Sequence, residues 1–181
     1  MKEIKAADLL SVFENENINE EDLSELVVKA LIEKSKKIAT AESCTGGLVS
    51  SKITDISGSS SVFDCGVCSY ANFIKQKVVG VKEETLSTYG AVSEKTAMEM
   101  ARGVRILSGA DIGISTTGIA GPLGGTQYKP VGLVYIGVST KEGLYAKKLM
   151  LSDVKEKSRE RIRELSCFAA LYFALHEIEK F

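Results

Sequence analysis

Histidine is almost absent from this sequence, since His176 is the only one among 181 residues. It lies far along the chain from the Ser-rich and Gly-rich motifs, which argues against a Ser-His-Asp triad. Net charge is nearly absent as well, because 23 Lys and Arg residues stand against 24 Asp and Glu residues. The molecule therefore has no overall field that would attract a polyanion, and we expect neither a nucleic acid nor an acidic membrane as its partner.

Long apolar runs are also missing. No stretch approaches the roughly 18 apolar residues of a membrane span, and residues 1–22 lack the features of a signal peptide. We therefore expect a cytoplasmic protein. The four cysteines, Cys44, Cys65, Cys68 and Cys167, have no framework spacing, so we expect reduced thiols. Cys65 and Cys68 form one C-x-x-C without a second Cys or His pair, and we interpret them as buried structural thiols.

What is present is the composition of an ordinary globular domain, with 44% hydrophobic and 26% charged residues. Residues 1–20 are weakly patterned, and we expect a short N-terminal leader of helix and linker there, followed by one domain over 21–181. Helical and strand periodicities alternate after the leader, which predicts a three-layer α/β/α sandwich with a mixed sheet. The predicted helices cover 19–37, 48–56, 72–81, 93–108 and 157–179, and the predicted strands cover 38–41, 65–70, 112–118, 131–140 and 144–152.

The first motif that could carry chemistry is TAESCTGG, residues 40–47, between a buried strand and a helix. Such a Gly-containing turn directs free backbone N–H groups at a ligand, where they stabilise an anion or a developing oxyanion. Ser43 occupies the position of an exposed nucleophile. The alternative is that Ser43 and Thr45 only cap the helix, which is the usual role of these residues. Cys44 is a second candidate nucleophile, although no His or other obvious base lies near it in the sequence to form a thiolate.

A serine without histidine needs another base, and a lysine whose charged form is destabilised by burial can serve. Lys75 follows Tyr70 closely in YANFIK, and both side chains can reach the same sheet edge. Tyr70 would relay a proton or hold the serine hydroxyl. The alternative is a half-buried aromatic beside a solvated cation. The spacing is one residue too long for the Y-x-x-x-K of short-chain dehydrogenases, and no G-x-G-x-x-G precedes it.

The third motif is STTGIAGPLGGT, residues 115–126, a strand that runs into a Gly-rich loop. Glycines let a backbone approach a ligand closely, and the hydroxyls of Thr116 and Thr117 can donate to phosphate or carbonyl oxygens. A phosphate or mononucleotide pocket is the functional interpretation. Lys129, Arg159 and Arg163 could add cationic contacts, although charges on a helix face are usually only solvated.

Four blocks in one order, TAESCTGGLVSSKITDISGSS, YANFIKQKVVGV, YGAVSEKTAMEMARGV and ISTTGIAGPLGGTQYKPVGLVYIGV, resemble the CinA C-terminal family, the nicotinamide-nucleotide amidases. The resemblance covers about residues 23–175, and the chain resembles the stand-alone form of the amidase. It implies hydrolysis of the carboxamide of nicotinamide mononucleotide to nicotinate mononucleotide and ammonia, on an α/β/α sandwich that forms homodimers. That chemistry requires neither a metal nor another cofactor.

The resemblance also assigns residues. It implies Ser43 as nucleophile, with Tyr70 and Lys75 as its catalytic partners. An arginine at the start of the last helix resembles a substrate-binding position, and both Arg159 and Arg163 are candidates for it because SDVKEKSRERIRE departs from the family pattern. The full set of predicted substrate-binding residues is Cys44, Thr45, Gly46, Gly47, Thr117, Gly118, Gly121, Arg159 and Arg163. The alternative function is a non-catalytic module that binds a mononucleotide through the same loops.

Overall fold

A single six-stranded mixed sheet forms the centre of the computed structural model, which describes residues 3–153 and 158–181. The strand order is β1-β6-β5-β4-β2-β3. β2 pairs in parallel with β3 and β4, and β1 pairs in parallel with β6, whereas the β4–β5 and β5–β6 pairs are antiparallel. The strands are β1 Glu3–Lys5, β2 Ile38–Glu42, β3 Phe63–Cys68, β4 Ile112–Gly118, β5 Leu133–Ser139 and β6 Leu144–Met150.

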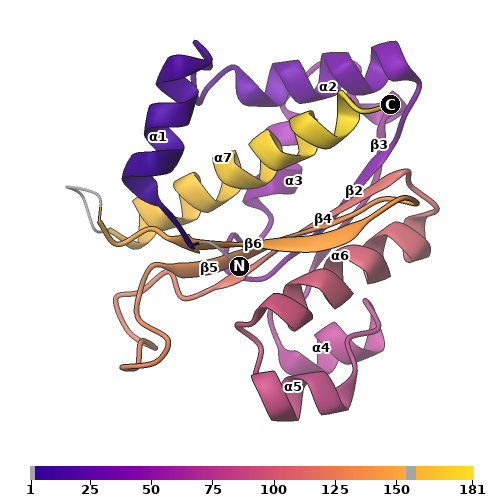
Figure 1. Ribbon diagram of the computed structural model, residues 1–181. Coiled ribbons are helices and arrows are strands. Elements are labelled where there is room, and N and C mark those ends of the chain that lie inside the picture. The colour runs from indigo at the N-terminus through magenta and orange to yellow at the C-terminus, as the bar shows by residue number, and fades with distance from the viewer. Residues whose placement is uncertain (1–2, 154–157) are drawn as a thin grey trace.

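Helices cover both faces of the sheet (Figure 1). One layer contains α1 Ala6–Asn15, α2 Leu23–Lys34, α3 Leu48–Thr54 and α7 Arg159–Ile178, with a short 3-10 turn at Ser59–Ser61. The other layer contains α4 Asn72–Lys77, α5 Glu83–Tyr89 and α6 Glu94–Ser108. The predicted α/β/α sandwich with a mixed sheet is therefore confirmed.

α7 forms the centre of the first layer. It lies against β4 and β5 and is flanked by α2 and α3. Fourteen of its residues are buried, on nearly all sides of the helix, as expected for a helix that is covered by other elements rather than lying at the surface. Its N-terminus is capped by Ser158, whose side chain accepts from the Arg161 N–H. This end of α7 brings Arg159 and Arg163 to the sheet edge where β2, β3 and β4 end.

α6 packs directly on the opposite face because glycines on the strands let its backbone approach. A Cβ atom added at Gly137 would lie 2.2 Å from the Ala97 carbonyl oxygen, and one at Gly113 would lie 2.1 Å from that of Ala101. The N-cap predicted at Ser93 is confirmed, since its side chain accepts from the Thr96 N–H. The seven-residue α5 was not predicted.

The N-terminal residues that were expected to form a helix and a linker contain an additional strand. β1 pairs with β6, and three residues are too few for a sequence period to reveal a strand. α1 follows it and buries Leu9 and Phe13 in the main core. The Phe13 and Tyr172 rings lie 5.2 Å apart, so residues 3–15 pack on the same core as the rest of the chain. The helix predicted to start at Asn19 begins at Leu23 instead, with Asp22 as N-cap.

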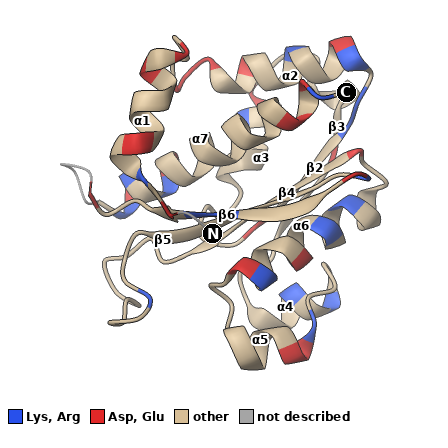
Figure 2. Ribbon diagram, in the orientation of Figure 1, with Lys and Arg blue, Asp and Glu red and all other residues tan. Residues whose placement is uncertain are grey.

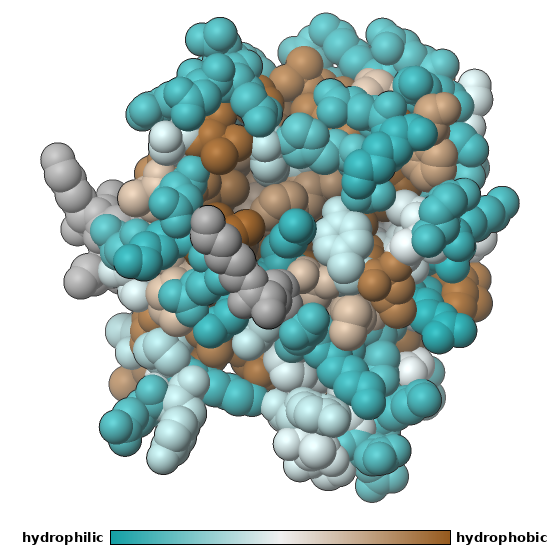
Figure 3. Space-filling view, in the orientation of Figure 1, coloured by the Kyte–Doolittle hydropathy of each residue, from teal (hydrophilic) through white to brown (hydrophobic). Residues whose placement is uncertain are grey.

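In the orientation of Figure 2, the helices carry charged residues of both signs. Figure 2 shows Lys and Arg interspersed with Asp and Glu on the helices, in keeping with the near-zero net charge. The face shown in Figure 3 is mostly hydrophilic, with smaller apolar areas between the polar side chains. Within 3–153 and 158–181, no helix has the combination of length and hydrophobicity that a bilayer crossing requires.

Candidate active site

Three parallel strands end at the same edge of the sheet, and the predicted motifs follow those ends. Ser43 comes directly after β2, Tyr70 lies two residues after β3, and Thr117 is the residue before the last one of β4. The Ser43 N–H donates to the carbonyl oxygen of Thr116 at 2.9 Å, which ties the β2 end to β4. The carboxyl edge of an α/β sheet is the usual location of a ligand site, and the topology places all three motifs there.

Lys75 lies beside Ser43, although 32 residues separate them. Its Nζ atom is 3.0 Å from the Ser43 Oγ atom, and the side chain is only 1% exposed. The same nitrogen contacts the carbonyl oxygens of Ser69 at 2.6 Å and Tyr70 at 3.2 Å. Burial lowers the pKa of Lys75, because the charged form loses hydration.

These three contacts define how a neutral Lys75 must be oriented. Carbonyl oxygens only accept, so the two N–H bonds of the neutral amine donate to Ser69 and Tyr70. Its lone pair is then left for the remaining neighbour, the Ser43 hydroxyl. The chain thus holds an amine in the position of a general base for serine. The Ser69 contribution is a backbone carbonyl, which no side-chain motif could have revealed.

Glu42 organises the turn that follows Ser43, and sequence reasoning did not assign it a role. Its buried carboxylate accepts from the N–H groups of Gly47, Val49 and Ser50 at 2.8–3.1 Å. It also accepts from the hydroxyl groups of Thr45 and Ser50. The available signal was an acidic residue just before the first turn of a helix, where a carboxylate is stabilised by unpaired N–H groups.

Glu42 uses part of the CTGG turn, which narrows the expectation that its free backbone N–H groups face a ligand. The Gly47 N–H donates to the Glu42 carboxylate. In the described structure, the backbone N–H groups of Cys44, Thr45 and Gly46 donate to no other residue. Gly46 has a φ of +63°, in the left-handed region that glycine tolerates without strain. The donors that remain for an oxyanion are therefore those between Ser43 and Gly47.

Cys44 is buried, and burial raises the pKa of its thiol to about 12. The thiol is consequently protonated at neutral pH and is a poor nucleophile. This disfavours Cys44 as the alternative to Ser43. Its side chain contributes to the wall of the pocket at Ser43 instead.

Tyr70 does not hold the Ser43 hydroxyl as predicted. Its side chain is 64% exposed, and its hydroxyl accepts from Arg159 at 3.2 Å. Arg159 also donates to the carbonyl oxygen of Gly121 at 2.9 Å. Arg159 therefore joins the region after β3 to the Gly-rich loop after β4.

The two candidate arginines occupy different places. Arg159 lines the pocket, whereas Arg163 lies behind the turn and donates to the carbonyl oxygen of Thr45 at 2.7 Å. Lys129 does not line the pocket either, because its ammonium donates to the carbonyl oxygen of Tyr89. Of the three predicted cations, only Arg159 is placed to meet a ligand in this pocket.

The pocket at Ser43 has a volume of about 200 Å³. This is below the roughly 300–1,000 Å³ typical of sites that enclose a whole small molecule, so it suits one end of a ligand. It brings together a majority of the predicted residues, namely Ser43, Cys44, Tyr70, Lys75, Thr117, Gly118 and Arg159. The predicted residues Thr45, Gly46, Gly47, Gly121 and Arg163 lie around it but not in its wall. Sequence reasoning missed the small apolar wall residues Ala91, Val92 and Ala120.

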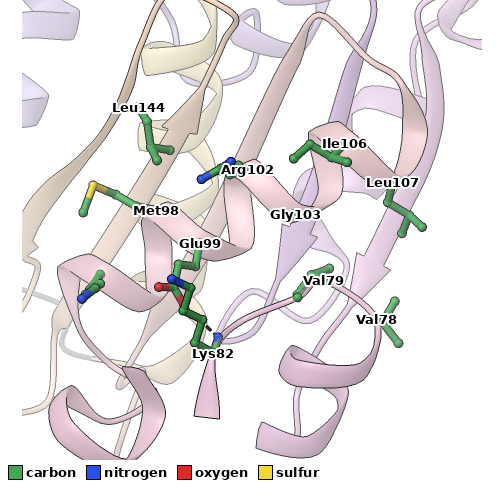
Figure 4. Close-up of a pocket in the computed structure, with 12 residues that line it drawn as sticks. Val78, Val79, Lys82, Met98, Glu99, Arg102, Gly103, Ile106, Leu107 and Leu144 are labelled. Atoms are coloured by element: carbon green, nitrogen blue, oxygen red, sulfur yellow. Dashed lines mark hydrogen bonds between the residues drawn. The ribbon is translucent and has the colours of Figure 1, made fainter. Parts of the chain in front are cut away.

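A larger groove of about 680 Å³ follows the outer side of α6 (Figure 4). Met98, Ile106 and Leu107 line it, together with Val78, Val79, Gly80 and Lys82. Leu107 is 54% exposed, although we had expected it on the buried face of the helix. The groove contains no nucleophile beside a base, so chemistry of the kind seen at Ser43 has no counterpart there.

The cysteines form no disulfide. Cys68 is exposed and Cys65 is half-buried, which corrects the expectation that both are buried. In the part of the chain that the structure describes, no three His, Cys, Asp or Glu side chains gather as metal ligands would.

Comparison with known proteins supports the resemblance of the four sequence blocks. Residues 20–178 match the family model described as the CinA C-terminal domain. The chain belongs to the CinA C-terminal domain family. It is 54% identical over 144 residues to a CinA-like protein of Kosmotoga olearia, a match that covers 80% of this chain and 35% of that protein. This chain thus spans about a third of the length of the curated relatives it matches.

Solved structures of CinA proteins share the fold. The competence/damage inducible protein CihA of Agrobacterium tumefaciens has a TM-score of 0.83 and 38% identity, covering 88% of this chain and 95% of that one. A CinA superfamily protein of Klebsiella pneumoniae also has a TM-score of 0.83, with 29% identity over 90% of this chain and 99% of that one.

Proposed function

We propose that this CinA-family protein is a nicotinamide mononucleotide amidase, which hydrolyses the carboxamide to nicotinate mononucleotide and ammonia. One observation carries the proposal: a buried lysine amine lies 3.0 Å from a serine hydroxyl in the wall of a small pocket. An amide is a chemically demanding acyl donor, and a serine activated by an adjacent base is a recurrent solution for it. The family resemblance supplies the identity of the amide.

In the first step, neutral Lys75 takes the proton of the Ser43 hydroxyl as the oxygen attacks the carboxamide carbon. A C–O bond forms, and the carbonyl oxygen becomes an oxyanion. The backbone N–H groups of Cys44, Thr45 and Gly46 are the donors beside Ser43 that have no other partner in the described residues. Loss of one oxyanion donor typically lowers turnover by about 10²–10³.

In the second step, Lys75 returns the proton to the amide nitrogen, the C–N bond breaks, and ammonia leaves. Water then attacks the acyl-enzyme, with Lys75 taking its proton, and Ser43 is regenerated as the acid product departs. The pocket accommodates the ring and the carboxamide. Arg159, at the rim, would contact the part of the mononucleotide that lies outside, where a guanidinium suits a phosphate.

Tyr70 acts through Arg159 in this proposal, because its hydroxyl accepts from that side chain and not from Ser43. Thr117 has a supporting role as well. Its hydroxyl donates to the carbonyl oxygen of Ala91 at 2.7 Å, so its remaining lone pairs can only accept from a ligand. A carboxamide N–H₂ group is such a donor. We further propose, from the family resemblance, a cytoplasmic homodimer.

The test is ammonia release from nicotinamide mononucleotide by protein treated with a chelator, with free nicotinamide as a control substrate. We expect release from the mononucleotide and far slower release from nicotinamide, which lacks the groups outside the pocket. The alternative is a module that binds the mononucleotide without hydrolysis. Saturable binding in calorimetry with no ammonia would favour that alternative and contradict the amidase.

A further inference from the structure

We propose that Glu42, Thr45 and Thr116 form a hydrogen-bonded network that positions Ser43 against Lys75. The inference rests on the proposed role of Ser43 as nucleophile. All three side chains are buried, and none of the three residues lines the pocket, so no side chain of the network contacts the substrate. The three side chains therefore act as positioning groups rather than catalytic ones.

The direction of the hydrogen bonds follows from the chemistry of the groups. The Glu42 carboxylate only accepts, so the Thr45 hydroxyl must donate its one hydrogen to Oε2 at 2.6 Å. The Thr45 and Thr116 hydroxyl oxygens are 2.6 Å apart, and Thr116 must therefore be the donor of that bond. The chain runs from Thr116 through Thr45 to Glu42 and has a single orientation.

Both ends of this chain hold Ser43. Glu42 is its neighbour in sequence, and the Thr116 carbonyl oxygen accepts from the Ser43 N–H at 2.9 Å. The Thr45 hydroxyl closes the ring between them. A displacement of about 1 Å between reacting groups can cost about 10²-fold in rate, so a loosened ring would separate Ser43 Oγ from the Lys75 amine enough to slow catalysis.

The carboxylate has two sides with different neighbours, which makes the role separable from simple folding. Oε2 accepts from the Thr45 hydroxyl and the Gly47 N–H, next to the nucleophile, and from the Val49 N–H in α3. Oε1 accepts from the N–H and the hydroxyl of Ser50, in the first turn of α3. The Ser50 hydroxyl also lies 2.7 Å from that of Thr40, so it joins the carboxylate to a threonine just as Thr45 does.

Thr45→Val and Ser50→Ala are consequently matched variants. Each removes one hydroxyl that joins Glu42 to a threonine, and each leaves the backbone donors of the turn in place. Thermal unfolding reports the structural cost of each. Turnover of nicotinamide mononucleotide and the rate at which phenylmethanesulfonyl fluoride modifies Ser43, followed by mass spectrometry, report the position of the nucleophile. Ser43→Ala serves as the blank for the modification.

We expect similar decreases in melting temperature for the two variants, with at least a tenfold decrease in kcat and in Ser43 modification for Thr45→Val only. Ser50→Ala should stay within threefold of the parent protein in both rates. Equal losses in the two variants, or no modification of Ser43 in the parent protein, would overturn the positioning network. Modification that depends on Thr45 in a protein that releases no ammonia would refute the proposed substrate while supporting the network.

Discussion

Lys75 is the most informative side chain to alter, because the proposed reaction needs it neutral and the fold buries it. Lys75→Arg keeps a cation of similar length, but a guanidinium is always protonated in proteins and cannot act as a base. General-base catalysis contributes about 10²–10⁴ in rate, equivalent to about 3–5 kcal/mol of barrier. We expect Lys75→Arg and Lys75→Met to lose at least that factor in kcat/KM.

The pH dependence of the parent protein tests the same idea without a mutation. The active form is the neutral amine, so log kcat/KM should rise with pH with a slope near one and then level off at the pKa of Lys75. Burial lowers that pKa, and the plateau should begin below the ordinary lysine value of about 10.4.

The stability of the fold should show the same titration. Lys75 has a lower pKa in the folded state than in the unfolded state. At low pH it is charged in both states, and burial of the charged form then destabilises the fold. That penalty declines as pH rises between the folded pKa and about 10.4. The stability advantage of Lys75→Met over the parent protein should therefore shrink over this range, as measured by urea unfolding. Activity that falls as pH rises, or a fully active Lys75→Arg, would refute the reasoning.

Cys44→Ala should keep kcat within threefold, since the thiol is protonated with a pKa of about 12; a hundredfold loss would make the thiol the nucleophile. Arg159→Gln should raise KM about tenfold with little change in kcat, and steady-state kinetics showing a kcat effect alone would contradict a binding role. Gly103→Ala should destabilise the protein by about 1–3 kcal/mol in urea unfolding, because a Cβ atom there would lie 1.7 Å from the Val79 carbonyl oxygen. Gly143→Ala is the control. Its Cβ atom would meet nothing closer than 4.0 Å, so its free energy of unfolding should change by less than about 0.5 kcal/mol.

Sequence reasoning found the layered fold because long helices and buried strands carry strong periodic signals. α6 and α7 were predicted close to their observed bounds, and the β5–β6 hairpin was predicted with its turn. β1 was missed because three residues define no period, and α5 because its pattern of seven residues is too short. These elements depend on tertiary packing.

The candidate site likewise has some features that the sequence predicts and others that it does not. Ser43 and Lys75 could be proposed from residue types and from the positions of strand ends, and the structure brings them into contact. The orientation of Tyr70 toward Arg159 could not be foreseen, since it depends on how α7 meets the sheet edge. Glu42 was overlooked because a carboxylate before a helix has many functions, and only the positions of its five donors reveal this one.

The occupied turn also affects where a phosphate can bind. A helix N-terminus is a common anion site, but the donors at the start of α3 already face the Glu42 carboxylate. Arg159, in the pocket wall near the rim, is the positive group that is still available to a phosphate. Loss of Arg159 should therefore weaken substrate binding and raise KM rather than lower kcat.

The central claim is that Ser43 forms the acyl-enzyme, and side-by-side ammonia release from nicotinamide mononucleotide by the parent protein and Ser43→Ala tests it most directly. Peptide mapping of acid-quenched reactions locates any covalent adduct in the same samples. The account predicts ammonia release by the parent protein and none by Ser43→Ala. Any covalent adduct should map to Ser43. Ammonia release by Ser43→Ala at the parent rate, or an adduct on Cys44, would contradict it.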